Sequence, residues 1–214
     1  FDLLITGSSQ PLSWSPVSRS GITATMSNPT ATSVRVTLTG PYATSSQHRS
    51  DNPGPISKPT LPQTFELVGR DRQGNPVVKY GFTLKQWFVN RGFGTYTYPN
   101  TLSWCNRIGY RMPSVSDLTN ASCRGTNSGS NCRGSVGATP SSPSNHYMRH
   151  IGSGFFTEWG YMPGYSGAGF REDNWFWTSD STGSNQFLVD TDNGYVGWSY
   201  PIANYTNAGL FSHP

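Results

Sequence analysis

Residues 100–118, NTLSWCNRIGYRMPSVSDL, predict two short helices joined by one buried turn. The first residue, an asparagine, can cap the first helix, whose apolar residues recur three or four positions apart. Gly109 can adopt the left-handed conformation that ends a helix, and the chain is then expected to run extended up to Pro113. Ser114 and Asp117 have the spacing of a capping box, so a second short helix is expected directly after the proline.

Residues 174–198, NWFWTSDSTGSNQFLVDTDNGYVGW, predict the late strands of an antiparallel sheet. Trp175 and Trp177 stand two positions apart, as on one face of a strand, and Asp192-Asn193-Gly194 has the composition of a turn. Together with the helical stretch, this pattern resembles a C-type lectin-like domain. The resemblance implies that the two segments close one domain.

The composition suits a folded, loop-rich extracellular protein. Of the 214 residues, 34% are hydrophobic and 14% are aromatic, which is enough for a core, whereas only 12% are charged. Gly (24) and Pro (16) are abundant, as in β-rich proteins with many turns. The net charge of +4 is spread over single Arg and Lys residues, so we expect no nucleic-acid partner.

Residues 1–84 predict a small β-sandwich. Apolar residues alternate with polar ones within 22–26, 34–38, 65–67 and 78–84, and turn-forming sequences separate these runs. The segment lacks the Cys-Trp-Cys core of antibody domains and resembles the disulfide-free immunoglobulin-like modules of bacterial surface proteins. Residues 40–63 are rich in Pro, Ser and Asn, and they either contain proline-interrupted edge strands or form a functional or mobile excursion.

The three cysteines permit at most one disulfide within the chain. Cys123 and Cys132 bracket a short flexible loop, so the spacing favours this local pair, which would stabilise the fold by about 2 to 3 kcal/mol. Cys105 lies on the inward face of the first predicted helix and is expected to be a buried thiol. A disulfide indicates an oxidising compartment.

An immunoglobulin-like module followed directly by a C-type lectin-like domain resembles the distal tip of intimin and invasin family adhesins. The expected fold class is mostly β with a small α+β part: an immunoglobulin-like β-sandwich in residues 1–84 and a C-type lectin-like domain in residues 85–214. Residues 77–89 connect the two without a flexible linker, which predicts a stiff pair with a packed interface. Family members often link the cysteine of the first helix to one near the end of the domain, but no cysteine follows Cys132 here.

The resemblance also implies a location and a partner. Family members carry such a tip on a rod of modules anchored by an N-terminal outer-membrane β-barrel, so we expect a monomeric fragment displayed on the bacterial cell surface and anchored by regions not in this chain. The first residues lack the sections of a signal peptide, and no run of apolar residues is long enough to span a membrane. The implied function is binding of a host surface or secreted protein, such as an integrin-like receptor or an immunoglobulin.

Two non-enzymatic alternatives stay open, a carbohydrate-binding lectin and a structural cap of a surface rod. Calcium-dependent lectins use Glu-Pro-Asn or Gln-Pro-Asp loops and a Trp-Asn-Asp strand, which are absent, so we expect no metal and no cofactor. Enzymatic patterns are incomplete as well. His146 and His150 have the spacing of zinc ligands without the glutamate, residues 164–168 lack the last glycine of a nucleophile elbow, and the late paired cysteines of the sulfatase-modifying oxidase are missing. We therefore expect no enzyme.

Residues 152–174, GSGFFTEWGYMPGYSGAGFREDN, occupy the position of the long loop of lectin-like domains and form the expected binding site. The glycines leave no regular element that could bury every aromatic side chain, and Trp, Tyr and Arg dominate interface energies. The candidate anchors are Trp159, Tyr161, Tyr165 and Phe170, and the candidate charged rim is Arg171, Glu172 and Asp173. Each ring is either an exposed anchor or part of a small core within the loop.

Overall fold

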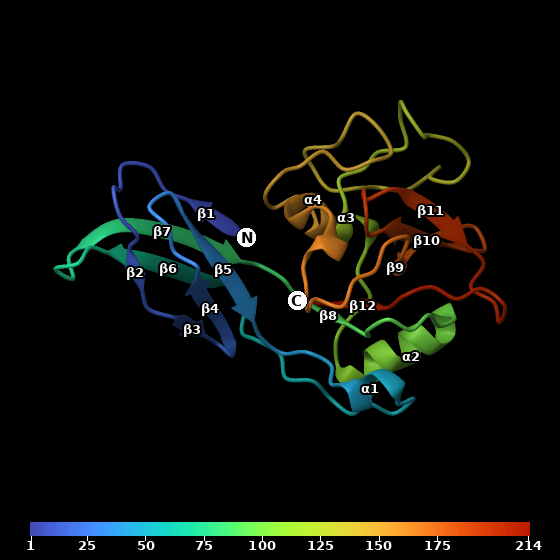
Figure 1. Cartoon of the computed structure of the whole chain (residues 1–214). Helices are drawn as coiled ribbons and strands as arrows, with labels where there is room; N and C mark the ends of the chain where they lie inside the picture. Colours follow the sequence, from blue (N-terminus) through green and yellow to red (C-terminus); the bar gives the residue numbers. More distant parts are fainter. The chain divides into compact units, whose positions relative to one another are not determined.

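The computed structural model describes residues 1–214 and divides the chain into two compact units (Figure 1). Unit 1 comprises residues 1–42, 57–87 and 213–214, and unit 2 comprises residues 43–56 and 88–212. The chain therefore passes between the units four times, because residues 43–56 and residues 88–212 each leave unit 1 and return to it. The expected stiffness of the junction and the expected boundary after residue 84 stay predictions.

Unit 1 consists of two antiparallel sheets, with strand orders β1-β5-β4-β3 and β2-β6-β7. The strands are β1 (Asp2–Leu4), β2 (Ser13–Trp14), β3 (Val17–Arg19), β4 (Ile22–Ser27), β5 (Ser33–Thr39), β6 (Gln63–Arg70) and β7 (Pro76–Leu84). The four alternating apolar runs of the sequence correspond to β4, β5, β6 and β7.

The core of unit 1 comes from alternate residues of both sheets. Ile22 and Ala24 of β4 and Val36 of β5 are buried together with Phe65 and Leu67 of β6. Strands place every second side chain on one face, so this alternation covers one side of each sheet with apolar groups. Residues from both sheets share one hydrophobic cluster, as expected for a β-sandwich.

Unit 2 mixes short helices with two small antiparallel sheets, β11-β10-β9 and β12-β8. Its helical elements are α1 (Ser45–Arg49), α2 (Tyr98–Ile108), α3 (Val115–Leu118), α4 (Phe155–Trp159) and the 3-10 helix η1 (Met162–Gly164). The strands are β8 (Trp87–Asn90), β9 (Trp175–Thr182), β10 (Asn185–Asp190), β11 (Val196–Ser199) and β12 (Leu210–His213). None of the helices has the length and apolar character that crossing a membrane requires.

The first predicted helix is α2, but it begins earlier than expected. Its N-cap is Thr97, whose hydroxyl accepts a hydrogen bond from the amide of Asn100 at 3.4 Å, so Asn100 is not the cap. Pro99 can lie in the first turn of the helix. Proline has no backbone N–H, and the N–H groups of a first turn have no acceptor within the helix. The helix ends as predicted at Gly109, which has a left-handed φ of 81°.

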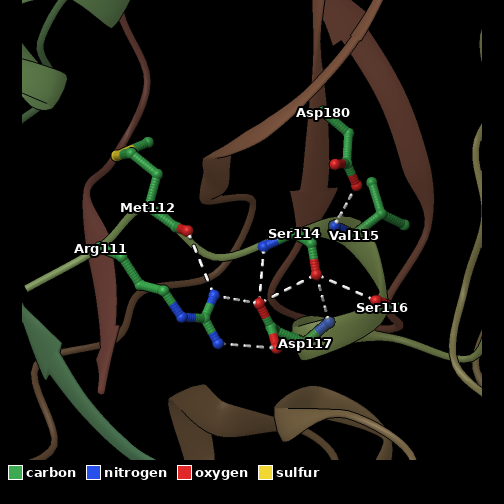
Figure 2. A network of polar contacts seen from close by, with 7 residues as sticks. All are labelled: Arg111, Met112, Ser114, Val115, Ser116, Asp117 and Asp180. Carbon is green, nitrogen blue, oxygen red and sulfur yellow. Dashed lines mark hydrogen bonds and ion pairs between the residues drawn. The ribbon is translucent and has the colours of Figure 1, made fainter. Parts of the chain in front are cut away.

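Figure 2 shows the turn that joins α2 to α3 and the polar network around Asp117. The carboxylate of Asp117 accepts hydrogen bonds from the amide of Ser114 at 2.8 Å and from the Arg111 guanidinium at 2.6 and 3.2 Å. In return the Ser114 hydroxyl accepts from the amide of Asp117 at 3.1 Å, which completes the predicted capping box. The amide of Val115 donates to Asp180 of β9 at 2.7 Å, so the start of α3 is also tied to the sheet.

Residues 43–56 belong to unit 2, which the sequence patterns did not reveal. This segment carries α1, which is capped by Thr44, and it lies against α2. The indole of Trp104 donates to the Gln47 carbonyl at 3.2 Å, and the amide of Ile56 donates to the Ile108 carbonyl at 3.1 Å. Only the apolar residues at its two ends, Ala43 and Ile56, are buried, so the segment has no apolar periodicity that could have predicted its place.

The cysteines divide into one disulfide and one thiol, as the loop spacing favoured. Cys123 and Cys132 are bonded to each other, and Cys105 on α2 is free and fully buried. Burial raises the pKa of the Cys105 thiol to about 12. The thiol is therefore protonated at neutral pH and unreactive, because the thiolate is the nucleophile.

Replacing Asp117 by alanine should lower the free energy of unfolding by about 2 kcal/mol, because the variant loses a helix cap and leaves the amide of Ser114 without its acceptor. Chemical denaturation followed by tryptophan fluorescence measures this, since five of the seven tryptophans lie in unit 2. The matched control is Asp2→Ala, which removes an exposed pair with Arg35 and should have a much smaller effect. Equal denaturation midpoints for the Asp117 variant and the wild type would contradict the assigned role.

Thiol titration should find no reactive cysteine in the native protein and one after unfolding without reductant, because Cys105 is buried and the other two are bonded. Peptide mapping under non-reducing conditions should recover Cys123 linked to Cys132. A peptide that links Cys105 to either of them would refute this arrangement.

Candidate functional site

The long loop, residues 152–174, is anchored to the core of unit 2 at its beginning. Gly154 has a φ of 99°, and a Cβ there would lie 2.6 Å from the amide nitrogen of Thr119, so the loop passes too close to the end of α3 for a larger residue. Phe156 of α4 is fully buried, and its ring centroid lies 5.7 Å from that of Phe176 on β9. Figure 1 shows α4 as the short orange helix beside α3.

Three of the four candidate aromatic anchors pack inward. Trp159, Tyr165 and Phe170 are partly buried against the hydrophobic core. The Tyr165 hydroxyl donates to the Trp159 carbonyl at 2.9 Å, and the two rings meet edge to face with centroids 5.8 Å apart. The ring of Phe170 packs against those of Phe156 and Phe176, 6.2 and 5.6 Å from their centroids. The loop thus has a small aromatic core of its own, and these three side chains help to hold its shape.

Tyr161 is the candidate anchor that faces solvent, with 44% of its surface exposed. Its hydroxyl donates a hydrogen bond to the carboxylate of Glu172, across the loop. This hydrogen bond is the main reason that the pKa of Tyr161 is raised to about 12. The exposed ring is consequently held in one orientation and remains protonated throughout the physiological pH range.

Arg171 is exposed and packs on an aromatic residue outside the loop. Its guanidinium carbon lies 4.2 Å from the ring centroid of Phe93, which is 52% exposed. The side-chain amide of Asn90 donates to the Gly169 carbonyl at 2.8 Å and ties the end of β8 to the loop. Sequence reasoning missed Phe93, although its position between two glycines, where no regular element could bury it, was an available signal.

We call Tyr161, Glu172, Arg171 and Phe93 the long-loop surface. It presents two exposed rings, each in contact with a charged side chain. The two charged residues, Arg171 and Glu172, are adjacent in the sequence. A guanidinium over a ring face is attracted by the ring's negative face, so Arg171 and Phe93 orient one another. The arrangement can bury aromatic surface against a partner and offer a cation and an anion at its edge.

Carboxylates gather next to this surface without forming a metal site. The amide of Asp173, the last candidate rim residue, donates to Asp192 at 3.1 Å, and Asp173 itself is exposed. Asp190 is nearly buried, and its pKa is raised mainly by burial, with a contribution from the charges of Asp192 and Asp173. No group of three or more His, Cys, Asp or Glu side chains is placed to hold a metal ion.

The two histidines with zinc-ligand spacing have separate surroundings. A ring nitrogen of His146 lies 2.8 Å from the side-chain amide of Asn127, and a ring nitrogen of His150 lies 2.8 Å from the Ser153 hydroxyl. These contacts give each histidine a polar partner of its own and involve no carboxylate.

No protein-family model matches the chain, but comparison with known proteins reveals a sequence relative and a structural relative. The inverse autotransporter adhesin YeeJ of Escherichia coli (strain K12) is 27% identical over 140 residues, which cover 61% of this chain and 5% of YeeJ. The crystal structure of invasin, described as a bacterial integrin-binding protein, superposes with a TM-score of 0.51 over 94% of this chain and 30% of that chain, at 12% identity. The chain is related to the intimin/invasin adhesins.

The relationship confirms the predicted family and fold class. The structural match is one of fold, because 12% identity is low, and the fold is mostly β with a small α+β part, as in invasin. The names of the two relatives describe adhesion and integrin binding. The chain spans only a small part of each of these intimin/invasin adhesins.

The Glu172→Gln variant should return the pKa of Tyr161 from about 12 toward the ordinary value of about 10, because a neutral acceptor no longer favours the protonated phenol. In the wild type the hydrogen bond should be fully present below the ordinary tyrosine pKa and be lost as the pH rises through the raised one. NMR of ring-labelled tyrosine, assigned with Tyr161→Phe, follows this titration. Identical titration of Tyr161 in both proteins would show that the hydrogen bond does not persist in solution.

Proposed function

We propose that the chain is the tip of a bacterial surface adhesin and binds a host surface or secreted protein through the long-loop surface. The observation that carries this proposal is the pairing of exposed Tyr161 with Glu172 and of exposed Phe93 with Arg171 on one loop region. Tyrosine and arginine are the residues that most often dominate the binding energy of protein interfaces. Kinship with the adhesin YeeJ supports the adhesive role.

The geometry favours binding because the exposed groups are already ordered. An interface loses free energy when it immobilises flexible side chains, and this loss is smaller for groups that their neighbours already hold. Tyr161 is held by its hydrogen bond to Glu172, and Arg171 is held by its stacking on Phe93. Below them, the packed rings of Trp159, Tyr165 and Phe170 support the backbone.

The proposed partner is a protein such as an integrin-like receptor or an immunoglobulin. Invasin is described as integrin-binding, and exposed tyrosine and arginine side chains are common in protein interfaces in general. We further propose that the tip acts as a monomer, on the cell surface, anchored by regions not in this chain. Action without calcium and without catalysis is part of the same proposal.

Tyr161→Ala and Arg171→Ala should each weaken binding of the host protein by roughly 10- to 100-fold, as expected for central interface residues. The probes are purified integrin ectodomains and immunoglobulin, tested by biolayer interferometry on the immobilised chain. Matched controls are Tyr42→Ala and Arg72→Ala, which remove an exposed tyrosine and an exposed arginine from unit 1 and should leave the affinity unchanged. Thermal unfolding of the chain alone should have the same midpoint with calcium and with chelator.

Two results would contradict the proposal. Wild-type affinity in both long-loop variants, for a host protein that the wild type binds, would place the interface elsewhere. Failure to bind any of the probes, together with failure to capture a protein from host membranes or secretory fluids, would favour a structural cap instead.

A further inference from the structure

The connection between β11 and β12 carries a row of exposed rings that the long-loop surface does not include. Tyr200 and Tyr205 are 42% and 44% exposed, and Ile202 between them is 57% exposed. The ring centroid of Tyr200 lies 5.4 Å from that of Trp198 and 5.3 Å from that of Tyr205. We call Trp198, Tyr200 and Tyr205 the aromatic platform.

The platform is held in place from both ends. Trp198 packs against the core, and its indole donates to the Ser130 carbonyl at 3.3 Å. On the other side, the amide of Tyr205 closes a turn by donating to the Ile202 carbonyl at 3.1 Å. The hydroxyls of Thr206 and Thr95 lie 3.0 Å apart and join this turn to the chain before α2. The exposed rings are therefore ordered before any ligand arrives, which reduces the entropy lost on binding.

Polar groups at the edge of the platform have no partner within the chain. The hydroxyls of Tyr200 and Tyr205 and the side-chain amide of Asn204 make no hydrogen bond to another residue, and all three side chains are exposed. By contrast, the hydroxyls of Tyr161 and Tyr165 are both used within the protein. The platform thus offers donors and acceptors to a ligand that lies on its rings.

The segments that carry the platform and its hydrogen-bonded neighbours contain no charged residue, although Arg124 and Arg133 flank one of them. Residues 193–212 contain no Asp, Glu, Lys or Arg, and the same is true of residues 92–106 and 125–132, which supply its neighbours Thr95 and Ser130. An anionic lipid surface or a nucleic acid would require Lys or Arg side chains here. Protein interfaces are enriched in arginine as well as in aromatic residues, and no arginine lies in these segments. The ligand that matches this surface is neutral and rich in hydroxyl groups.

We infer that the aromatic platform is a second binding site, which takes neutral saccharides without a metal ion. One face of a pyranose ring presents C–H groups with partial positive charge, which are attracted to the negative face of an aromatic ring. The sugar hydroxyls would exchange hydrogen bonds with the Asn204 amide and the phenol groups at the edge. This inference does not depend on the long-loop surface, because the two sites share no residue.

Saturation-transfer-difference NMR with lactose, chitotriose and maltotriose at millimolar concentration tests the inference. At least one sugar should receive saturation at its ring C–H protons from the wild-type protein, and Tyr200→Ala/Tyr205→Ala should weaken that binding by at least about tenfold. The protein is produced in a bacterial host, because Asn204-Tyr205-Thr206 is a formal acceptor for N-glycosylation. Tyr205→Gln, which removes one exposed ring and keeps a polar group, serves if the double variant does not fold.

Controls separate this site from the other proposals. Tyr161→Ala and addition of chelator should leave saccharide binding unchanged, whereas the platform variants should keep their affinity for a host protein bound at the long loop. Absence of saturation transfer to all three sugars would overturn the inference, as would full binding by a folded platform variant or loss of binding with chelator. A further outcome would also overturn the inference: the wild type binds no sugar, sediments as a dimer, and loses this dimerisation in the platform variants. The rings would then form a contact between two copies of the chain.

Discussion

The carboxylate of Asp117 forms the interaction on which the arrangement of unit 2 depends. It joins Arg111, in the turn after α2, to Ser114, at the start of α3, and so sets the direction between the two helices. The same short turn pairs with distant parts of the chain: the backbone of Arg111 bonds to Ser212, and the Pro113 carbonyl accepts from the amide of Ser179 at 2.8 Å. The helices and the late strands are therefore ordered together, because the turn needs partners from all of them.

A buried cation ties the segment 43–56 to the same unit. Arg91 is 2% exposed, and its guanidinium carbon lies 3.5 Å from the ring centroid of Tyr96 and 5.0 Å from that of Trp104. Desolvation lowers the pKa of this group, and the rings offset part of the cost because cation–π attraction strengthens away from water. The nearest carboxylate, 4.0 Å away, is that of Asp51 in the segment itself. Residues 43–56 thus supply the carboxylate nearest to the buried charge of Arg91.

Both proposed binding surfaces lie on connections between regular elements, where binding residues are commonly found. They differ in chemistry. The long-loop surface combines rings with a cation and an anion, whereas the aromatic platform combines rings with uncharged polar groups. A protein receptor decorated with neutral glycans would offer both chemistries to one adhesin tip. Each surface is supported by packed side chains beneath it, so neither relies on the loop becoming ordered on contact.

The sequence by itself determined the features that depend on near neighbours. The capping box at Ser114, the left-handed end of α2 at Gly109 and the alternation in β4 to β7 are local, since each is decided by dihedral preference or by period within a few residues. The short loop between Cys123 and Cys132 likewise favoured the disulfide that the structure contains. The adhesin resemblance followed from these motifs and their order.

Tertiary structure decided what depends on distant partners. In the glycine-rich long loop no period distinguishes Trp159, which packs inward, from Tyr161, which faces solvent. The contact of Arg171 with Phe93 joins positions far apart in the sequence. The segment 43–56 has too few apolar residues for its sequence to predict that it packs against α2. These outcomes rest on which surfaces meet after the chain has folded, and no local preference encodes that.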